Sequence, residues 1–148
     1  MAIEAPRLEW ARGWLAAPKR AFVGGTWSAG GGGGRTLVNP ADGTPLATVD
    51  ECDAGDVDRA VAAAQAAFTG AWSRWTRRER ADLLRRLGEV ARSHRAELAT
   101  LESLQNGMTW SEAYEGNLPD CADIFDYFAG WVDKLGGETL PVERGFFN

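Results

Sequence analysis

Residues 117–137 carry the pattern that most constrains what this chain can fold into. Over this stretch apolar side chains recur every three or four positions, and most of the acidic residues fall between them. That period predicts an amphipathic helix whose apolar stripe must lie against a larger body. Asn117 is a candidate N-cap, Pro119 is tolerated in a first turn, and Gly136-Gly137 would stop the helix. The apolar positions are Leu118, Cys121, Ala122, Phe125, Phe128, Ala129, Val132 and Leu135.

Two further helices precede this one. The first runs from Asp53 to Phe68, with Asp56 placed three residues after the cap as in a capping box. The second opens at Thr76, with Glu79 as its box partner, and its apolar spacing continues to Asn106-Gly107 as one long helix. His94 lies on or beside the apolar stripe of that helix, which favours a packing role because no nucleophile or acid partner is marked near it.

Short strands fill the region before the helices. Ala21–Ser28 predicts a hairpin turning at Gly24-Gly25, and a second hairpin joins Arg35–Val38 to Thr44–Val49. Residues 30–34 are all glycine. A phosphate-binding loop needs a strand before it and a helix after it, whereas a strand-like run follows here. We therefore expect a loose hairpin tip.

The composition limits the possible functions. The net charge of -5 argues against non-specific nucleic-acid binding. The basic run 74–86 is interrupted by acids and predicts a solvated helix face. No apolar run could span a membrane and no signal peptide opens the chain, so we expect a cytoplasmic protein. Two cysteines give no disulfide framework, and one histidine rules out a multi-histidine metal site.

Six motifs, in order from Phe22 to Asn148, resemble the opening of the NAD(P)-dependent aldehyde dehydrogenases. The segment 127–134 is similar to the end of the third helix of that family, and 101–108 is similar to its E-T-L-D-N-G-K-P stretch. The quoted segments are Phe22–Trp27, Val38–Gly43, Asp56–Val61, Trp75–Arg80, Leu101–Met108 and Tyr127–Lys134.

The resemblance implies an α/β lineage: the N-terminal helices and β-hairpins of a cofactor domain, with three main helices plus short strands and without the parallel dinucleotide-binding sheet. Residues 1–20 would be an N-terminal arm, a short amphipathic helix that either packs on the domain or stays loose. Residues 21–137 would be the N-terminal part of the cofactor-binding domain. Residues 138–148 would begin an oligomerisation hairpin, truncated within its second strand.

The family oxidises an aldehyde to a carboxylic acid with NAD or NADP as the hydride acceptor. Its nucleophilic Cys, general-base Glu and cofactor-binding residues all follow the region matched here. Cys52 lies among acids that disfavour a thiolate, and Cys121 lies on the helix stripe, where it would pack. We therefore transfer no catalytic or cofactor-binding residue, and expect this chain alone to be inactive and to bind no NAD(P).

Two lesser sites are implied by the resemblance. Asp120 matches a position near the mouth of the family's substrate tunnel, where a carboxylate would favour cationic aldehydes; alternatively, it only offsets the helix dipole. The family's monovalent-cation site would use backbone oxygens near Leu37 and Val38. Gln105 stands where the family has an Asp ligand, and an amide oxygen is the weaker ligand.

Three interpretations remain. The chain is the inactive N-terminal segment of an aldehyde dehydrogenase. Alternatively, it is a binding or assembly module that pairs with a separate chain or a full-length relative, as a homo- or hetero-oligomer, through exposed helix stripes and the 138–148 strands. The third is an unrelated small α+β domain that reuses the pattern.

Overall fold

The computed structural model describes residues 3–137, so the strands expected within 138–148 lie outside the described residues. Helices predominate, and the strands form two separate two-stranded antiparallel sheets. In chain order the elements are α1 (Ala5–Ala16), β1 (Ala21–Val23), β2 (Thr26–Ser28), β3 (Gly33–Val38), β4 (Pro45–Glu51), α2 (Ala54–Thr69), the 3-10 turn η1 (Trp72–Arg74), α3 (Arg77–Ser93), α4 (Arg95–Asn106), α5 (Trp110–Glu112), the π-helical turn η2 (Ala113–Asn117) and α6 (Leu118–Trp131).

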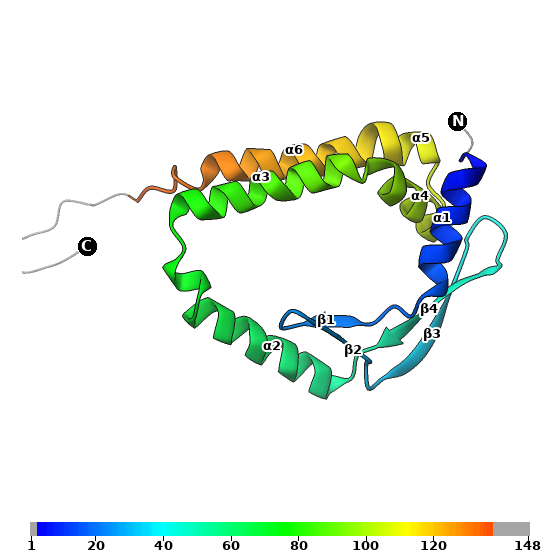
Figure 1. Ribbon diagram of the computed structural model, residues 1–148, viewed down its shortest axis with the longest axis horizontal. Helices are drawn as coiled ribbons and strands as arrows, with labels where there is room; N and C mark the ends of the chain where they lie inside the picture. The colour runs from blue at the N-terminus through cyan, green and yellow to red at the C-terminus, as the bar shows by residue number, and fades with distance from the viewer. Residues whose placement is uncertain (1–2, 138–148) are drawn as a thin grey trace, which may run out of the picture.

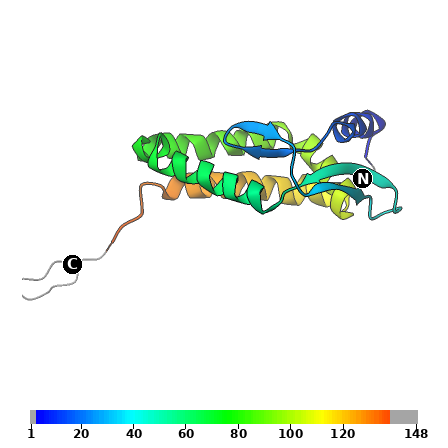
Figure 2. The ribbon, with the colours of Figure 1, turned by 90° about the horizontal axis from the view of Figure 1, so that it is seen from below.

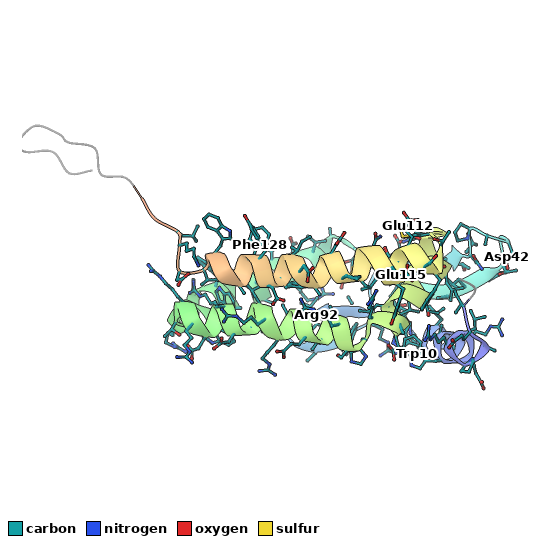
Figure 3. All side chains as sticks on the ribbon, turned by 90° about the horizontal axis from the view of Figure 1, so that it is seen from above. Trp10, Asp42, Arg92, Glu112, Glu115 and Phe128 are labelled. Carbon is teal, nitrogen blue, oxygen red and sulfur yellow. The ribbon has the colours of Figure 1, made fainter. Side chains whose placement is uncertain are left out.

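The antiparallel pair α3 and α6 is the most extensive contact between elements (Figure 1). Small buried residues let the two helices approach closely: Ala81, Gly88 and Ala91 on α3, and Ala122 and Ala129 on α6. Figure 3 shows the two helices side by side, with Arg92 on α3 and Phe128 on α6.

An ion-pair cluster joins the exposed edge of this helix pair. Arg92 Nη2 donates to Asp123 Oδ1 at 2.9 Å and to Asp126 Oδ2 at 2.5 Å. These hydrogen bonds raise the pKa of the Arg92 guanidinium above its usual range, Asp126 having the larger effect. The cluster is solvent-exposed, so it fixes the register of the two helices more than it stabilises them.

Aromatic stacking forms a core at the α4 end of the pair. Trp110 is buried and stacks on Tyr114 with ring centroids 4.5 Å apart. Its indole Nε1–H donates to Thr100 Oγ1 at 3.1 Å, and Thr100 in turn donates to the Ala96 carbonyl. The guanidinium of Arg7 lies over the Trp110 ring, which ties α1 to this core.

Helix α1 packs on α4 and touches β4, so the N-terminal helix rests on the rest of the structure. Both perpendicular views place α1 and the β3–β4 hairpin near the α4 end of the α3–α6 pair (Figures 1 and 2). The β1–β2 hairpin turns at Gly24-Gly25 as predicted, and its partners Phe22 and Trp27 bring their ring centroids within 4.8 Å.

Both predicted capping boxes are confirmed, at Asp53 with Asp56 and at Thr76 with Glu79. The helix after Thr76 is not continuous, because the backbone leaves helical geometry at His94, with φ -105° and ψ 20°. His94 is exposed at this junction of α3 and α4, so the predicted packing role is wrong. The stop at Gly107 is confirmed, with a left-handed φ of 81°.

The predicted cap at Asn117 is also wrong. Asn117 has helical geometry and makes no capping hydrogen bond, because helical structure already begins at Trp110, where Thr109 accepts from the Glu112 amide. The five-residue π turn η2 connects α5 to α6 without interrupting the helical backbone. Pro119 has no N–H and would clash with the carbonyl four residues earlier, and a wider π turn removes that clash.

Part of the predicted apolar stripe of α6 is exposed. Leu118, Ala122 and Ala129 are buried, whereas Cys121 and Phe128 are exposed, so the packing role predicted for Cys121 is wrong. None of the helices within residues 3–137 has the length and apolar character needed to cross a membrane.

Replacing Gly88 with Val is expected to destabilise the α3–α6 pair. A Cβ at this position would lie 3.1 Å from the Ala122 carbonyl oxygen, so the helices would have to separate. The cost expected for such overpacking is about 1–3 kcal/mol of unfolding free energy, measured by urea denaturation.

Gly130→Ala in α6 is the matched control. A Cβ at Gly130 meets no atom within 4 Å, so the gain in helix propensity should leave stability unchanged or raise it by up to about 1 kcal/mol. Equal destabilisation by both variants would contradict the close-packing interpretation.

Candidate functional site

One face of α6 presents the candidate site predicted from the sequence. Asn117, Asp120, Cys121, Ile124 and Phe125 line an open hollow of about 370 Å³. Their spacing of three and four residues places them on one side of the helix. The hollow joins one carboxylate, one amide and one thiol to an apolar floor. Such a surface can hold the apolar part of a ligand and attract a cationic group at one end.

Asp120 is exposed in this hollow. The helix-dipole explanation for this residue is weakened by the structure, because helical backbone runs without interruption from Trp110 through η2 into α6. A carboxylate more than two turns from the true helix start gains little from the dipole. The charge of Asp120 is therefore available to a ligand.

Asn117 lies at one edge of the hollow and connects it to α4. Its side-chain amide donates to Glu102 Oε1 at 3.2 Å and lies 3.2 Å from Met108 Sδ. The sequence predicts only a capping role for Asn117, and no local signal in it marks these two partners.

The predicted cation-site residues come from two separate elements. Leu37 and Val38 lie at the end of β3, and Gln105 is exposed near the end of α4. Their neighbours meet: a Cβ at Gly107 would lie 3.0 Å from Pro40 Cγ. The structure thus brings the two segments to the same region, while the ligand set itself remains a prediction. Within residues 3–137, no group of three or more His, Cys, Asp or Glu side chains is arranged to hold a metal ion.

Both cysteines are free and exposed. Cys52 lies between β4 and α2, and Cys121 lies on α6. No hydrogen bond to either thiol occurs in the described part of the chain, so neither has the adjacent base that activates a nucleophilic thiol.

The glycine run is held against the start of α2, so the predicted loose hairpin tip is wrong for its first half. The Gly31 amide donates to Asp56 Oδ2 at 2.7 Å, and the Gly32 amide donates to the Glu51 carbonyl at 2.9 Å. Gly33 and Gly34 begin β3. Side chains are excluded here, since a Cβ at Gly30 or Gly31 would lie only 2.1 Å from an oxygen.

Asp56 is the centre of this contact and is 4% exposed. Its carboxylate accepts from the amides of Gly31 and Asp53, and Arg59 forms an ion pair with it. The hydrogen bond from Gly31 and then that from Asp53 hold the pKa of Asp56 below its usual range, with a smaller contribution from the Arg59 charge.

The N-terminus of α2 does not fit the pyrophosphate of a dinucleotide cofactor. A pyrophosphate needs unoccupied amides at a helix N-terminus, after a parallel strand. The α2 N-terminus carries the carboxylates of Asp53 and Asp56, which would repel it, and the strands in residues 3–137 form only antiparallel pairs.

Comparison with known proteins places this arrangement in a family. The aldehyde dehydrogenase family profile matches residues 27–148. Cytosolic 10-formyltetrahydrofolate dehydrogenase of Xenopus tropicalis is 39% identical over 129 residues, which are 86% of this chain and 14% of the relative. Putative aldehyde dehydrogenase DhaS of Bacillus subtilis is 40% identical over 111 residues, 74% of this chain and 22% of that protein.

Solved structures agree with the sequence matches. The NAD+ complex of aldehyde dehydrogenase from Bacillus cereus superposes with a TM-score of 0.87 and 34% identity, covering 97% of this chain and 29% of that one. An indole-3-acetaldehyde dehydrogenase gives a TM-score of 0.85 and 31% identity, covering 97% and 33% of the two chains.

The chain belongs to the aldehyde dehydrogenase family and corresponds to an N-terminal segment of it. It spans about one seventh of the 10-formyltetrahydrofolate dehydrogenases and less than a third of the Bacillus cereus enzyme. The resemblance and the fold class predicted from the sequence are therefore confirmed.

Asp56→Asn is expected to lower stability at neutral pH and to flatten its acid dependence. A carboxyl group whose pKa is depressed by folding stabilises the native state above the pKa of the unfolded chain. That stabilisation is lost as the pH falls through the folded pKa. Urea midpoints of the native chain should therefore drop more steeply below about pH 4 than those of Asp56→Asn.

Asp58→Asn is the control, because Asp58 is exposed on the same helix. It should leave the pH dependence close to that of the native chain. If Asp56→Asn and the native chain showed parallel acid curves, the hydrogen bonds from Gly31 and Asp53 would not stabilise the carboxylate.

Proposed function

We propose that this chain forms the N-terminal part of an NAD(P)-dependent aldehyde dehydrogenase, whose complete form oxidises an aldehyde to a carboxylic acid. By itself the chain has no dehydrogenase activity. The family match over residues 27–148 is the observation that carries this proposal. The NAD+ complex of the Bacillus cereus relative supports NAD or NADP as the hydride acceptor of the complete enzyme.

The proposed inactivity rests on the two cysteines and on the cofactor. A thiol nucleophile needs a base beside it, and a hydride acceptor must be held next to the thiohemiacetal carbon. Cys52 and Cys121 have no such base among the described residues. The α2 N-terminus is filled by carboxylates, so no step of hydride transfer is assigned to these residues.

The exposed apolar faces support a role as one layer of a larger protein. Large side chains that point to solvent lie on both α2 and α6, where Phe68 is 66% exposed and Phe128 is 55% exposed. Val57 and Val61 continue the α2 face, and Trp131 continues the α6 face. Such contiguous apolar surfaces mark contacts with another body.

A chimera tests the proposal. Residues 27–148 replace the matched segment of the Bacillus cereus aldehyde dehydrogenase, and NADH formation is followed with acetaldehyde. We expect the chimera to retain activity, because the helices and hairpins superpose at a TM-score of 0.87. The purified chain of 148 residues should form no NADH under the same conditions.

A folded chimera without activity would contradict the proposed place of this segment. Its folding is checked by circular dichroism and by cooperative thermal unfolding. NADH formation by the isolated chain would contradict the proposed inactivity.

The second candidate function is a binding or assembly module. The same apolar faces on α2 and α6 favour it, because they would also fit a separate chain or a full-length relative in a homo- or hetero-oligomer. Sedimentation of the isolated chain separates the two candidates. A monodisperse monomer that unfolds cooperatively would count against the assembly module, whereas a stable 1:1 complex with a full-length aldehyde dehydrogenase would favour it.

The proposed enzyme is cytoplasmic, as are the relatives named cytosolic, although mitochondrial 10-formyltetrahydrofolate dehydrogenases are also similar to this chain. The cation site at Leu37, Val38 and Gln105 is part of the same proposal.

We further propose that Asp120 lies at the mouth of the substrate tunnel. In the active chimera, Asp120→Asn should raise the KM for a cationic aldehyde such as betaine aldehyde by about threefold to tenfold, while the KM for acetaldehyde stays unchanged. Asp58→Asn, which changes an exposed carboxylate on α2 outside this hollow, is the control. An equal change in KM for both aldehydes would contradict the proposed position of Asp120 at the tunnel mouth.

A further inference from the structure

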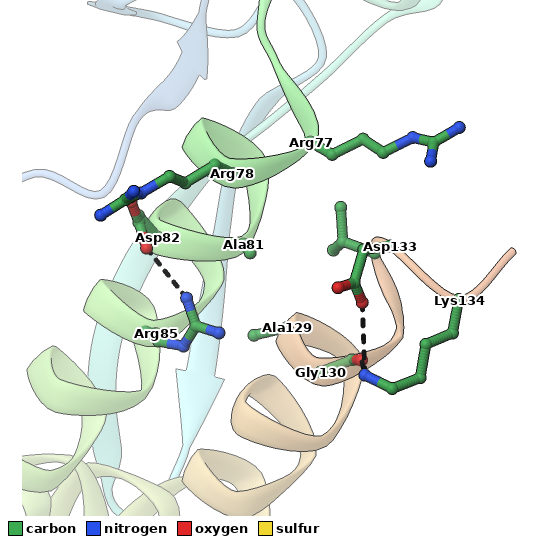
Figure 4. Close-up of a pocket in the computed structure, with 10 residues that line it drawn as sticks. Arg77, Arg78, Ala81, Asp82, Arg85, Ala129, Gly130, Asp133 and Lys134 are labelled. Atoms are coloured by element: carbon green, nitrogen blue, oxygen red, sulfur yellow. Dashed lines mark hydrogen bonds and ion pairs between the residues drawn. The ribbon is translucent and has the colours of Figure 1, made fainter.

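A second hollow lies between the first turns of α3 and the end of α6, at the other end of α6 from the Asp120 site (Figure 4). Its volume is about 540 Å³, within the range of small-molecule pockets. Its floor is made of Ala81, Ala129 and Gly130, so no large side chain fills the space above the contact between the two helices.

Four cations surround this floor. Arg77, Arg78 and Arg85 come from α3, and Lys134 follows α6. The lining also contains Asp82 and Asp133, so the four cations and two carboxylates leave a charge of +2. The chain as a whole carries -5, so this local excess runs against the overall charge.

Each carboxylate is shared by two cations. Asp82 pairs with Arg85 at 2.9 Å and more loosely with Arg78 at 3.8 Å. Asp133 pairs with Lys134 at 3.2 Å. The hydrogen bond from Lys134 and then the Lys134 charge hold the pKa of Asp133 below its usual range, with a smaller contribution from the charge of Arg77. One positive charge therefore remains on each wall of the hollow.

A phosphate dianion matches this arrangement. Guanidinium groups bind phosphate oxygens with two parallel hydrogen bonds, and two cationic walls neutralise two negative charges. Arg78 and Arg85 are exposed enough to turn toward a ligand, with side-chain exposures of 91% and 52%. The uncharged floor leaves room for the group that carries the phosphate.

We propose that the hollow between α3 and α6 binds a small molecule that bears a phosphate or pyrophosphate group. Arg85 and Arg78 bind the phosphate on one wall, and Arg77 and Lys134 contribute positive charge on the other. The inference is independent of the proposed function, since it requires no aldehyde, no NAD(P) and no other part of an enzyme.

Titration of the full chain with inorganic pyrophosphate, followed by amide chemical shifts, tests the proposal. We expect saturable shifts at Ala81 and Gly130, with a Kd of about 1 mM or tighter at low salt. Raising the ionic strength should weaken binding, because the contacts are charged and partly exposed.

Three variants locate the site. Arg85→Gln should weaken binding by about threefold or more, whereas Arg86→Gln, the same change one residue on in α3 and outside the hollow, should leave the Kd unchanged. Asp82→Asn should tighten binding by about threefold, because it removes the competing carboxylate. A gain in affinity cannot arise from misfolding.

The proposal is overturned if pyrophosphate gives no saturable shift at Ala81 or Gly130, or if Arg86→Gln weakens binding as much as Arg85→Gln. Titrations with ADP and adenosine identify the source of the phosphate. Tighter binding of ADP than of pyrophosphate supports an organic phosphate ester, and equal binding supports free phosphate. Adenosine binding as tightly as ADP also overturns the proposal.

Discussion

The close contact between α3 and α6 is the interaction on which the rest of this structure depends. It is made by glycine and alanine, so two long helices touch almost backbone to backbone. Close approach of this kind gains dispersion contacts but buries little apolar area for each residue. The helix pair therefore holds its geometry tightly while leaving its larger side chains free to face other surfaces.

Because small residues occupy the α3–α6 contact, the large side chains lie elsewhere in the structure. The aromatic core at Trp110 lies at one end of the pair, and it links α1, α4 and the α5–η2 turn. Elsewhere Phe68, Phe128 and Trp131 point outward. The helix pair thus keeps its small residues inside and its large residues outside, and exposed apolar faces of this kind are typical of surfaces that contact another body.

Much of this fold could be predicted from the sequence, because helix caps and hairpin turns are local. The boxes at Asp53 and Thr76 and the left-handed stop at Gly107 each depend on residues within three or four positions of one another. The break at His94 and the π turn before Pro119 could not be predicted, since the apolar period continues through both. The contact of Gly31 with Asp56 spans 25 residues, and spacing alone does not reveal such a pair.

The π turn has a consequence for how this segment can vary. It accommodates one more residue per turn than an α-helix, so it sets the rotation of α6 relative to the core at Trp110. Loss of a single residue within 113–117 would restore an α-helical turn and bring back the clash between Pro119 and the carbonyl four residues before it. A further inserted residue would exceed what the turn absorbs and would rotate α6 by about 100° about its axis, so Ala122 and Ala129 would leave the contact with α3. Natural variants of this segment should therefore tolerate substitutions in η2 far better than insertions or deletions.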